Sequence, residues 1–432
     1  MATTELQTRL VETFHRWLQE SNHHRWSPHH PLRRIALEAF QKMGFPTSRH
    51  EDWKYTSLAP VLRPAYRIEP PSPAETSSLL SQLPALESLP GPHIWMLTGI
   101  PVVASLPPYV RLDSLLYSDG EVPPWLGEIL RPDAETFIAL NTAFAPDVAT
   151  LSLAGQAKEI LHIAVVTSAV EEPQLSQPRL CLTLEPEARG RVLLSFHTLG
   201  SYPSLTNFVA EVRLAPNSDL ELILWQTEPS ESFLITTVGA ELDRSARLTV
   251  WTLALGGALI RNNLYIRLAA PGAETQLFGA TMVSGQQIVD HRTQVEHQAE
   301  QCLSNQLYKS IADAQATVTF TGRIYVHPRA QKTNAYQSHR AVLLSEKATV
   351  NARPQLEIYA DDVRCTHGAT VGSLDEDALF YMRSRGIPLD YARALLLHAF
   401  LSEPLKSLSD AALWEYADIL IAERTHLQAV KP

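Results

Sequence analysis

Three similar segments decide the fold of this chain: GRVLLSFHTL (190–199), SDLELILWQT (218–227) and ARLTVWTLAL (246–255). Each begins at a turn residue and is rich in the apolar and β-branched residues that are typical of strands. Their starting points, Gly190, Ser218 and Ala246, are evenly spaced, and a similar turn follows at Ala273 after nearly the same interval. Because no helix-like segment separates them, this period predicts a coil of strands in which each turn buries its inward side chains by stacking on its neighbours.

The domain organisation follows from where this pattern begins and ends. Residues 150–372 are predicted to form a mainly β core, a β-helix, with a β-sandwich as the alternative because three similar intervals are few. Residues 1–149 are predicted to form an N-terminal helical and mixed region, in which 6–18 and 32–43 show helical periodicity. Residues 373–432 return to helix.

The composition excludes several classes of protein. The chain has 432 residues, a net charge of −10 and three cysteines. This disfavours a nucleic-acid-wrapping protein, which is normally basic, and a secreted protein held by disulfides. No uninterrupted apolar run is long enough for a membrane span, and the first residues lack the apolar run of a secretory signal. We therefore expect a cytoplasmic protein that binds neither nucleic acid nor a membrane.

The C-terminal region contains clear helix signals. Ser373 and Glu376 have the spacing of a capping box, and Gly386 ends the predicted helix. The next segment, 389–401, is apolar on nearly all sides, which is more than a surface helix needs to pack on one core. It is either a docking element for another protein chain or a helix buried in a small cap.

The chemically richest segment is YADDVRCTHGATVG (359–372). If the preceding strand continues, Cys365 and His367 share one face, where a thiol and an imidazole can cooperate on a metal or in proton transfer. The structural alternative is a small buried thiol and an ordinary edge histidine. The sequence has no motif for a phosphate-binding loop, dinucleotide binding, a zinc protease or a Cys-x-x-Cys site, which disfavours an NTPase or a redox enzyme.

Further polar clusters are weaker candidates. Asp361 and Asp362 suggest a polysaccharide-cleaving β-helix, but neighbours on a strand face opposite ways and cannot easily flank one glycosidic bond. The segment 48–58 mixes acidic, basic and aromatic residues without an assignable catalytic geometry. Two histidine-containing clusters could bind a metal, yet they are more typical of a solvated strand face and a solvated loop. They are Asp290, His291, Glu296 and His297, and His23, His24, His29 and His30.

Several of these stretches resemble the SufB/SufD family of iron–sulfur cluster assembly proteins. They are EDWKYT (51–56), ALNTAFAPD (139–147), RNNLYIRL (261–268) and, above all, PQLEIYADDVRCTHGATVG with the following ALFYMRSRGIP (354–388). Cys-Thr-His-Gly-Ala-Thr at 365–370 is similar to the SufD branch and differs from the cysteine-and-glutamate pattern of SufB.

The resemblance implies a right-handed parallel β-helix and membership of the SufBCD complex, in which SufC is the ABC-type ATPase. It implies that this chain is a non-ATPase scaffold subunit that pairs with SufB through the β-helix. It also implies that SufC docks on the C-terminal helices, where the candidate contacts are Tyr391, Leu395, Leu396 and Phe400.

The resemblance further assigns roles at the SufB interface. His367 matches the family histidine that faces a SufB cysteine where the nascent cluster forms, and Cys365 matches the nearby cysteine. The chain alone is expected to hold no cofactor stably, with the nascent iron–sulfur cluster present only transiently in the complex. Because an exposed β-helix edge has unpaired backbone groups, the isolated chain can also form a homodimer.

The alternative from another class is a stand-alone metal-binding β-helix enzyme. It would use Cys365 and His367, with His291 and His297 as further ligands. Metal content and turnover of the isolated chain separate this enzyme from the scaffold.

Overall fold

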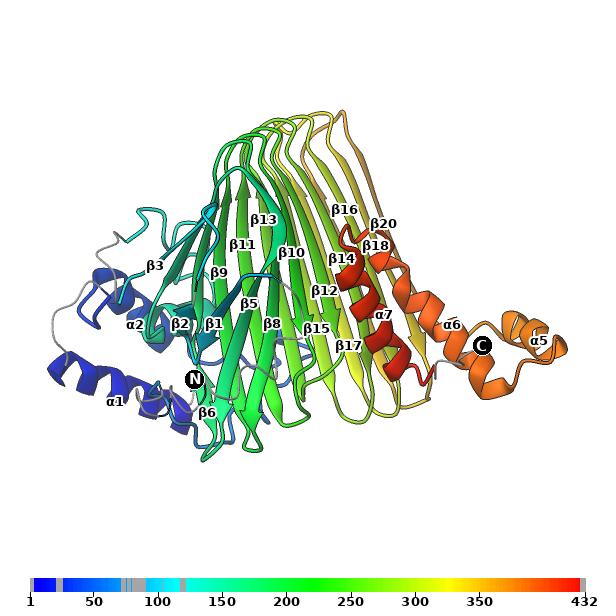
Figure 1. Cartoon of the computed structure of the whole chain (residues 1–432), viewed down its shortest axis with the longest axis horizontal. Helices are drawn as coiled ribbons and strands as arrows, with labels where there is room; N and C mark the ends of the chain where they lie inside the picture. Colours follow the sequence, from blue (N-terminus) through cyan, green and yellow to red (C-terminus); the bar gives the residue numbers. More distant parts are fainter. Residues whose placement is uncertain are drawn as a thin grey trace.

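The computed structural model describes residues 4–20, 26–70, 75, 79, 91–103, 105–116 and 122–427. Its centre is a parallel β-solenoid of about eight turns between N-terminal and C-terminal helices (Figure 1). The predicted mainly β class with a parallel β-helix core between two helical regions is thereby confirmed. The chain alternates between two sheets, so each turn contributes one strand to each sheet.

The two sheets are called sheet I and sheet II, and their strands are given in spatial order. Sheet I contains β2 (Ile100–Val103), β1 (His93–Leu97), β5 (Gln156–Ala169), β8 (Arg189–Gly200), β10 (Asp219–Gln226), β12 (Arg247–Ala254), β14 (Glu274–Val283), β16 (Leu303–Ala312), β18 (Asn334–Leu343) and β20 (Arg364–Gly372). Sheet II contains β19 (Thr349–Ile358), β17 (Thr317–Val326), β15 (Ile288–His297), β13 (Leu259–Leu268), β11 (Ser232–Leu242), β9 (Ser204–Leu214), β7 (Arg179–Leu184), β4 (Ala149–Leu153) and β3 (Val110–Ser114), and β6 (Gln174–Ser176) pairs with β9.

The stacking of the turns follows the period in the sequence. Asp219 of β10 pairs in parallel with Arg247 of β12, and Arg247 pairs with Glu274 of β14, which are the intervals expected from the repeat. The first interval differs from the expected one. Asp219 pairs with Arg189 and not with Arg191, because that turn of the coil is slightly longer than the next two. Equivalent positions of successive turns lie about 4.8 Å apart.

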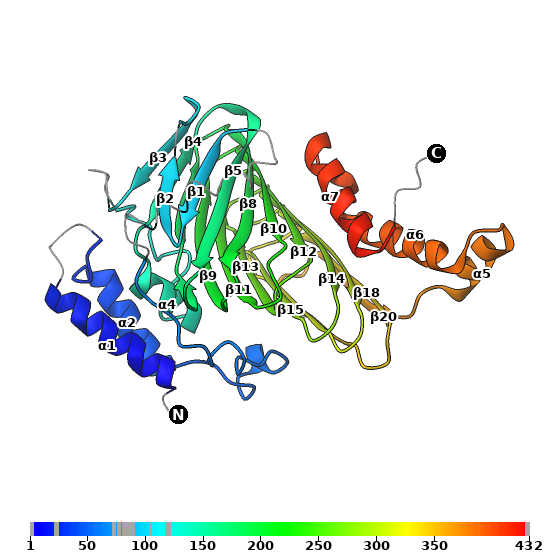
Figure 2. The same ribbon diagram turned by 60° about the horizontal axis from the view of Figure 1, so that its bottom comes forward.

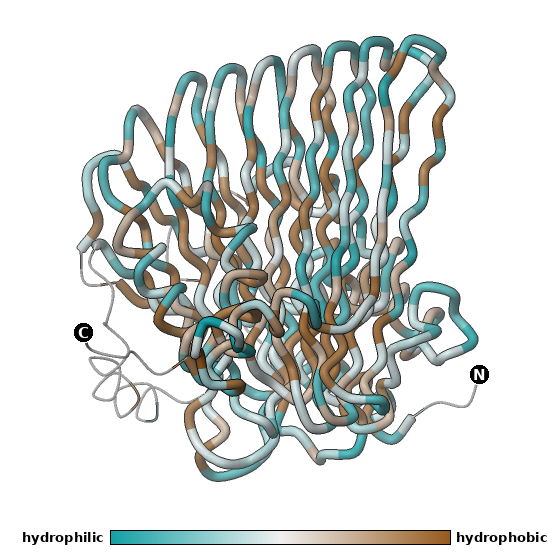
Figure 3. The backbone as a smooth tube through the Cα atoms, turned by 90° about the vertical axis from the view of Figure 1, so that its right-hand side faces the viewer, coloured by the Kyte–Doolittle hydropathy of each residue, from teal (hydrophilic) through white to brown (hydrophobic). Residues whose placement is uncertain are grey.

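The core lies between the two sheets and is apolar over most of its length. Its inward side chains include Leu222 of β10 and Val250 of β12, which are in register and buried. Alternation of hydrophobic and hydrophilic positions along the strands is visible in Figure 3, which views the molecule from the side of its C-terminal turns. The alternation arises because successive side chains of a strand point to opposite faces.

One corner of the coil repeats the same backbone conformation with few glycines. The residues there have φ values between 54° and 73°, and their backbone N–H groups donate to carbonyls of the following turn. They are Glu187, Asn217, Ser245, Gly272, Gln301 and Lys332. These hydrogen bonds along the corner offset the strain of a left-handed conformation in residues other than glycine.

The N-terminal region covers the outer face of sheet II (Figure 2). Its helices are α1 (Glu5–Glu20), α2 (Pro31–Met43) and α4 (Thr136–Phe144), with a short 3-10 helix, η1 (Glu51–Trp53), after α2. Strands ahead of residue 149 also join the coil, because β1 pairs with β5 and β3 pairs with β4. The sheets therefore begin earlier in the sequence than the periodic segments do.

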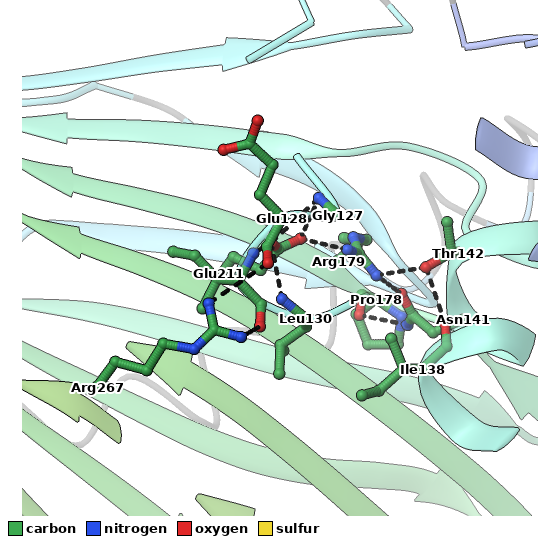
Figure 4. A network of polar contacts seen from close by, with 11 residues as sticks. Gly127, Glu128, Leu130, Ile138, Asn141, Thr142, Pro178, Arg179, Glu211 and Arg267 are labelled. Carbon is green, nitrogen blue, oxygen red and sulfur yellow. Dashed lines mark hydrogen bonds and ion pairs between the residues drawn. The ribbon is translucent and has the colours of Figure 1, made fainter. Parts of the chain in front are cut away.

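Figure 4 shows how the loop before α4 is attached to sheet II. Glu211 of β9 accepts hydrogen bonds from the backbone N–H groups of Gly127 and Leu130 and forms an ion pair with Arg179 of β7. Both charged side chains are fully buried, and Arg179 also donates to Thr142 of α4 at 2.8 Å. Because the buried carboxylate has several donors, the network specifies how loop, helix and sheet meet.

The C-terminal region consists of α5 (Glu376–Ser384), α6 (Leu389–Ser402), η3 (Pro404–Ser407) and α7 (Ala411–Arg424). Residues of α6, η3 and α7 pack on the outer face of sheet I. In Figures 1 and 2, α5 lies at the end of the molecule opposite to α1 and α2 and projects away from the coil. None of the described helices is long and apolar enough to span a bilayer.

The predicted capping box of α5 is wrong. The helix begins at Glu376, and its N-cap is Asp375, whose carboxylate accepts a hydrogen bond from the backbone N–H of Ala378 at 3.0 Å. Asp375 competes successfully with Ser373 because an acidic N-cap also interacts favourably with the positive end of the helix dipole.

Candidate functional site

The coil ends on an uncovered turn, made of β19 and β20. Each strand lies at the end of its sheet and pairs with one parallel neighbour, β17 and β18 respectively. Every residue of β20 except Cys365 is exposed, whereas alternate residues of β18 are buried. Positions that point into the core in earlier turns are therefore presented at this surface, which we call the open end of the coil.

Cys365 and His367 both belong to the inward row of the open end. They are in register with Ala335 and Gln337 of β18, which are buried. Cys365 is half-buried, and burial raises the pKa of its thiol, with a backbone hydrogen bond from Ala335 opposing the shift. The thiol is therefore protonated at neutral pH, whereas the exposed imidazole of His367 is accessible to a metal ion or a proton donor.

Three polar residues that the sequence analysis did not single out lie behind this row. They are Gln306 of β16 and Gln337 and His339 of β18, each no more than 3% exposed. Along a strand, polar residues at alternate positions look like a solvated face. Only the register within the repeat shows that these three point inward, because a shift of one residue would move them to the other face.

Asp290 and His291 do not share a site. Asp290 lies on the outer face of β15, where it accepts a hydrogen bond from Thr56 at 2.5 Å and pairs with Arg261. His291 points into the core and lies 2.7 Å from the hydroxyl of Thr281. Both are buried, so the expected solvated strand face is wrong here: the N-terminal region covers one side of β15 and the core covers the other.

Glu296 and His297 are separated in the same way. His297 is buried and its Nε2 lies 2.9 Å from the hydroxyl of Ser304, whereas Glu296 pairs with His327. In the other histidine cluster, the Nδ1 of His30 accepts from the N–H of Leu32 at the start of α2, and His23 and His24 lie outside the described residues. Among the residues that the structure describes, no group of three His, Cys, Asp or Glu is arranged to hold a metal ion.

The segment 51–56 fastens the N-terminal region along sheet II. Its residues contact several turns of the coil, and they include a guanidinium carbon 3.8 Å from the centroid of an indole ring. The contacts are Trp53 with Arg261 of β13, Asp52 with Arg292 of β15 and Glu51 with Arg353 of β19. The mixed composition of this segment thus serves an interface within the chain that extends to the last turn of the coil.

The four candidate docking residues of α6 are all half-buried: Tyr391, Leu395, Leu396 and Phe400. Phe400 packs towards sheet I, where the Nζ of Lys309 lies 4.3 Å from its ring centroid. The buried apolar side chains of α6 are Ala392, Ala394, Leu397 and Leu401. The helix therefore packs on the body through one side and leaves Tyr391, Leu395 and Leu396 partly accessible.

Helix α5 carries exposed aromatic side chains that the sequence analysis did not single out. Phe380 is 73% exposed and Tyr381 is 59% exposed, and no residue of α5 is buried. Large aromatic residues in solvent are more typical of an interface than of a free surface. The signal in the sequence was the apolar run ALFYM (378–382) inside a helix of only nine residues.

Comparison with known proteins agrees with this architecture. The model for the SUF system FeS cluster assembly SufBD core domain matches residues 165–400, and the model for the SufBD protein N-terminal region matches residues 4–74. The chain is 28% identical over 401 residues to an iron–sulfur cluster assembly SufBD family protein of Synechocystis sp., which covers 88% of each chain. It is 28% identical over 418 residues to the iron–sulfur cluster assembly protein SufD of Escherichia coli, which covers 91% of this chain and 92% of the relative.

The core match begins near the end of β5 and covers the rest of the solenoid, the open end and most of α6. The N-terminal match includes the segment that fastens to sheet II. The chain therefore belongs to the SufBD family of iron–sulfur cluster assembly proteins, and the relatives it matches over nine-tenths of its length include SufD.

Proposed function

We propose that this chain is a non-ATPase scaffold subunit of a SufBCD complex. It pairs with SufB through the open end of the coil, docks the ATPase SufC through its C-terminal helices and contributes His367 to a nascent iron–sulfur cluster at the SufB interface. Cys365 lies beside this site as a second candidate ligand or proton donor.

The observation that carries the proposal is the exposure of an inward row at the last turn. Earlier turns cover such residues with the next turn. At the last turn, β19 and β20 instead present a mostly apolar row that includes Cys365 and His367, and two unpaired strand edges. A strand edge of this kind pairs readily with another chain. A second solenoid subunit would both cover the row and satisfy the edges.

The ligand chemistry of the open end supports a shared site. A neutral imidazole is a good iron ligand, and the thiol of Cys365 is held in its protonated form by burial. One ready ligand makes a poor cluster site by itself, because iron–sulfur clusters are held mainly by cysteine thiolates. The missing thiolates would come from SufB, and the isolated chain would hold no cluster stably.

The test of this proposal is a His367→Ala variant co-expressed with SufB and SufC and purified without oxygen. We expect the three subunits to co-purify as in the parent, while iron and sulfide loading of the complex falls about tenfold or more. The matched control is His15→Ala, which removes another exposed histidine on α1. Normal loading in the His367 variant, with the complex intact, would show that the residue has no part in cluster assembly.

A further inference from the structure

Gln337 is a buried amide with no hydrogen-bond partner. It is 3% exposed, and neither its Oε1 nor its Nε2 has a partner in the structure. Buried polar groups are nearly always hydrogen-bonded, so an unpaired buried amide requires a physical explanation. The neighbouring Gln306, one turn earlier, also has an unpaired Nε2, although its Oε1 accepts from Thr293 at 2.7 Å.

The fold makes room for this amide at a specific place. The side chain reaches across the core from β18 to β17, where residue 322 is glycine. A Cβ added at Gly322 would overlap the Nε2 of Gln337. An alanine at 322 would therefore displace the amide, and the space beside β17 is occupied by Gln337 instead of by a side chain of sheet II.

In the strand register, Gln337 lies between Gln306 and His367. Gln306 pairs with Gln337 in the β16–β18 register, and Gln337 pairs with His367 in the β18–β20 register. Side chains in register on neighbouring strands lie about 4.8 Å apart, a separation that the flexible ends of an amide and an imidazole can close to hydrogen-bond length. The open end thus has an unpaired carbonyl one strand below its exposed imidazole.

We propose that Gln337 is a positioning residue for His367: its Oε1 accepts the N–H of the inward-facing ring nitrogen, which leaves the lone pair of the other nitrogen directed out of the open end. The Nε2 of Gln337 then donates to the free lone pair of the Gln306 carbonyl. Ligating histidines are normally oriented by this kind of hydrogen bond to an acceptor behind the ring, which selects the tautomer. The inference rests on the proposed role of His367 and adds the group that prepares it.

The tautomer of His367 can be measured without the complex. In the full chain labelled with 15N in its histidine rings, the His367 signals are assigned from their loss in a His367→Gln variant. At a pH where the rings are neutral, we expect one tautomer in the parent and exchange-averaged signals of two tautomers in Gln337→Met. The control Gln355→Met changes an exposed glutamine of the neighbouring strand β19 and should leave the His367 signals unchanged.

A stability measurement separates positioning from a structural role. Gln337→Met replaces a buried amide by an apolar side chain of similar length, and the exposed His367 ring that loses its acceptor can hydrogen-bond to water. We therefore expect the unfolding midpoint of the variant to stay close to that of the parent. In the SufBCD complex, the same variant should load iron and sulfide about tenfold more slowly than the parent while the subunits still co-purify. A structural residue would instead lower the midpoint and leave the tautomer unchanged.

A second variant keeps the inference testable if Gln337→Met folds poorly. Gly322→Ala retains the amide and displaces it, so it should give the same two-tautomer signature. Identical His367 signals in the parent and in both variants would overturn the positioning role, even if His367→Ala confirmed the proposed function. Normal loading in His367→Ala would instead overturn the proposed function, whatever the tautomer measurement showed.

Discussion

Glu228 is a single buried carboxyl group with a large energetic consequence. It is 3% exposed, two residues beyond the end of β10, and its Oε2 has no hydrogen-bond partner. Burial raises the pKa of Glu228 to about 7, against an ordinary value of 4.5, although hydrogen bonds from Thr198 oppose the shift. The folded protein therefore holds a proton that the unfolded chain releases between pH 4.5 and 7.

We expect Glu228→Gln to stabilise the protein at high pH. A folded pKa above the unfolded one means that the parent loses stability as pH rises from 4.5 to 7, by up to about 3 kcal/mol, and regains none above that range. The variant lacks this loss, so its free energy of unfolding in urea should exceed that of the parent at pH 8 and differ little at pH 4. Glu231→Gln, an exposed neighbour, is the control, and equal stability of Glu228→Gln and parent at pH 8 would contradict the raised pKa.

At the scale of one residue, the sequence identified candidate site residues better than it predicted their burial and contacts. Cys365 and His367 were recognisable because a thiol and an imidazole at alternate strand positions share a face. Gln337 was not, since nothing local distinguishes an inward glutamine from an outward one. The prediction of a solvated strand face at Asp290 and His291 was wrong for the same reason, because the partners that bury these residues come from other segments of the chain.

Helix α5 makes no buried contact with the rest of the described chain. None of its residues is buried, and its exposed Phe380 and Tyr381 are followed by Arg383 and Arg385 on a helix that projects from the body. An exposed aromatic pair at the far end of the molecule is a natural anchor for a partner chain. In the proposed complex this partner is SufC, and α5 acts together with the accessible side of α6.

Substituting Phe380 and Tyr381 should weaken the proposed interface with SufC and leave the proposed interface with SufB intact. We expect Phe380→Ser with Tyr381→Ser to weaken SufC binding at least tenfold in a titration while SufB still co-purifies, because buried aromatic anchors contribute most of the affinity of an interface. The control changes two exposed apolar residues outside the C-terminal helices, Ile35→Ser with Tyr202→Ser. Undiminished SufC affinity in the α5 variant would exclude this helix from the SufC interface.

At the scale of elements, the repeat period and the helical pattern of apolar residues predicted which strands and helices form. They did not predict where each element begins and ends. The even spacing of the repeats corresponds to real turns, and the helices near 6–18, 32–43 and 389–401 form. The cap of α5 and the longer turn between Arg189 and Asp219 differ from expectation. Both depend on local competition between neighbouring residues, which a pattern of apolar positions does not resolve.

The whole molecule carries buried and partly buried histidines that couple its stability to acid. Burial lowers the pKa of each from 6.5, to about 3 for two of them and to about 4 for three. They are His162 and His291 in the first group and His197, His297 and His339 in the second. The fold thus holds five neutral rings that the unfolded chain would protonate below pH 6.5.

We expect the free energy of unfolding to fall steeply between pH 6.5 and about 4. A folded pKa below the unfolded one confers stability above pH 6.5 that is lost as the pH falls, at about 1.4 kcal/mol per pH unit for each fully protonating group. Burial raises the pKa values of Glu228, Glu135 and Asp147, so these carboxyl groups act in the opposite sense over part of this range, but they are three groups against five. Urea unfolding at pH 7, 6 and 5 gives the slope directly.

A single substitution checks the cause of this slope. His339→Gln can keep the contact to Ser310, which lies 3.1 Å from its Nε2, and it removes one titrating ring. The slope of the free energy of unfolding against pH should decrease by the contribution of one proton, about 1.4 kcal/mol per pH unit. His15→Gln on the exposed face of α1 should leave the slope unchanged. An unaltered slope in His339→Gln would mean that this ring is protonated in the folded state.

By itself, the sequence determined the coil of strands, the helical regions at both ends and the segment that carries Cys365 and His367, because period and residue type are local properties of the chain. Only the tertiary structure decided which polar side chains face the core, which segment fastens the N-terminal region to sheet II and that the last turn is left uncovered. Each of these depends on register between strands of successive turns and on contacts between segments distant in the sequence. Such pairings are selected by packing of the whole molecule and leave no signature within a single stretch of residues.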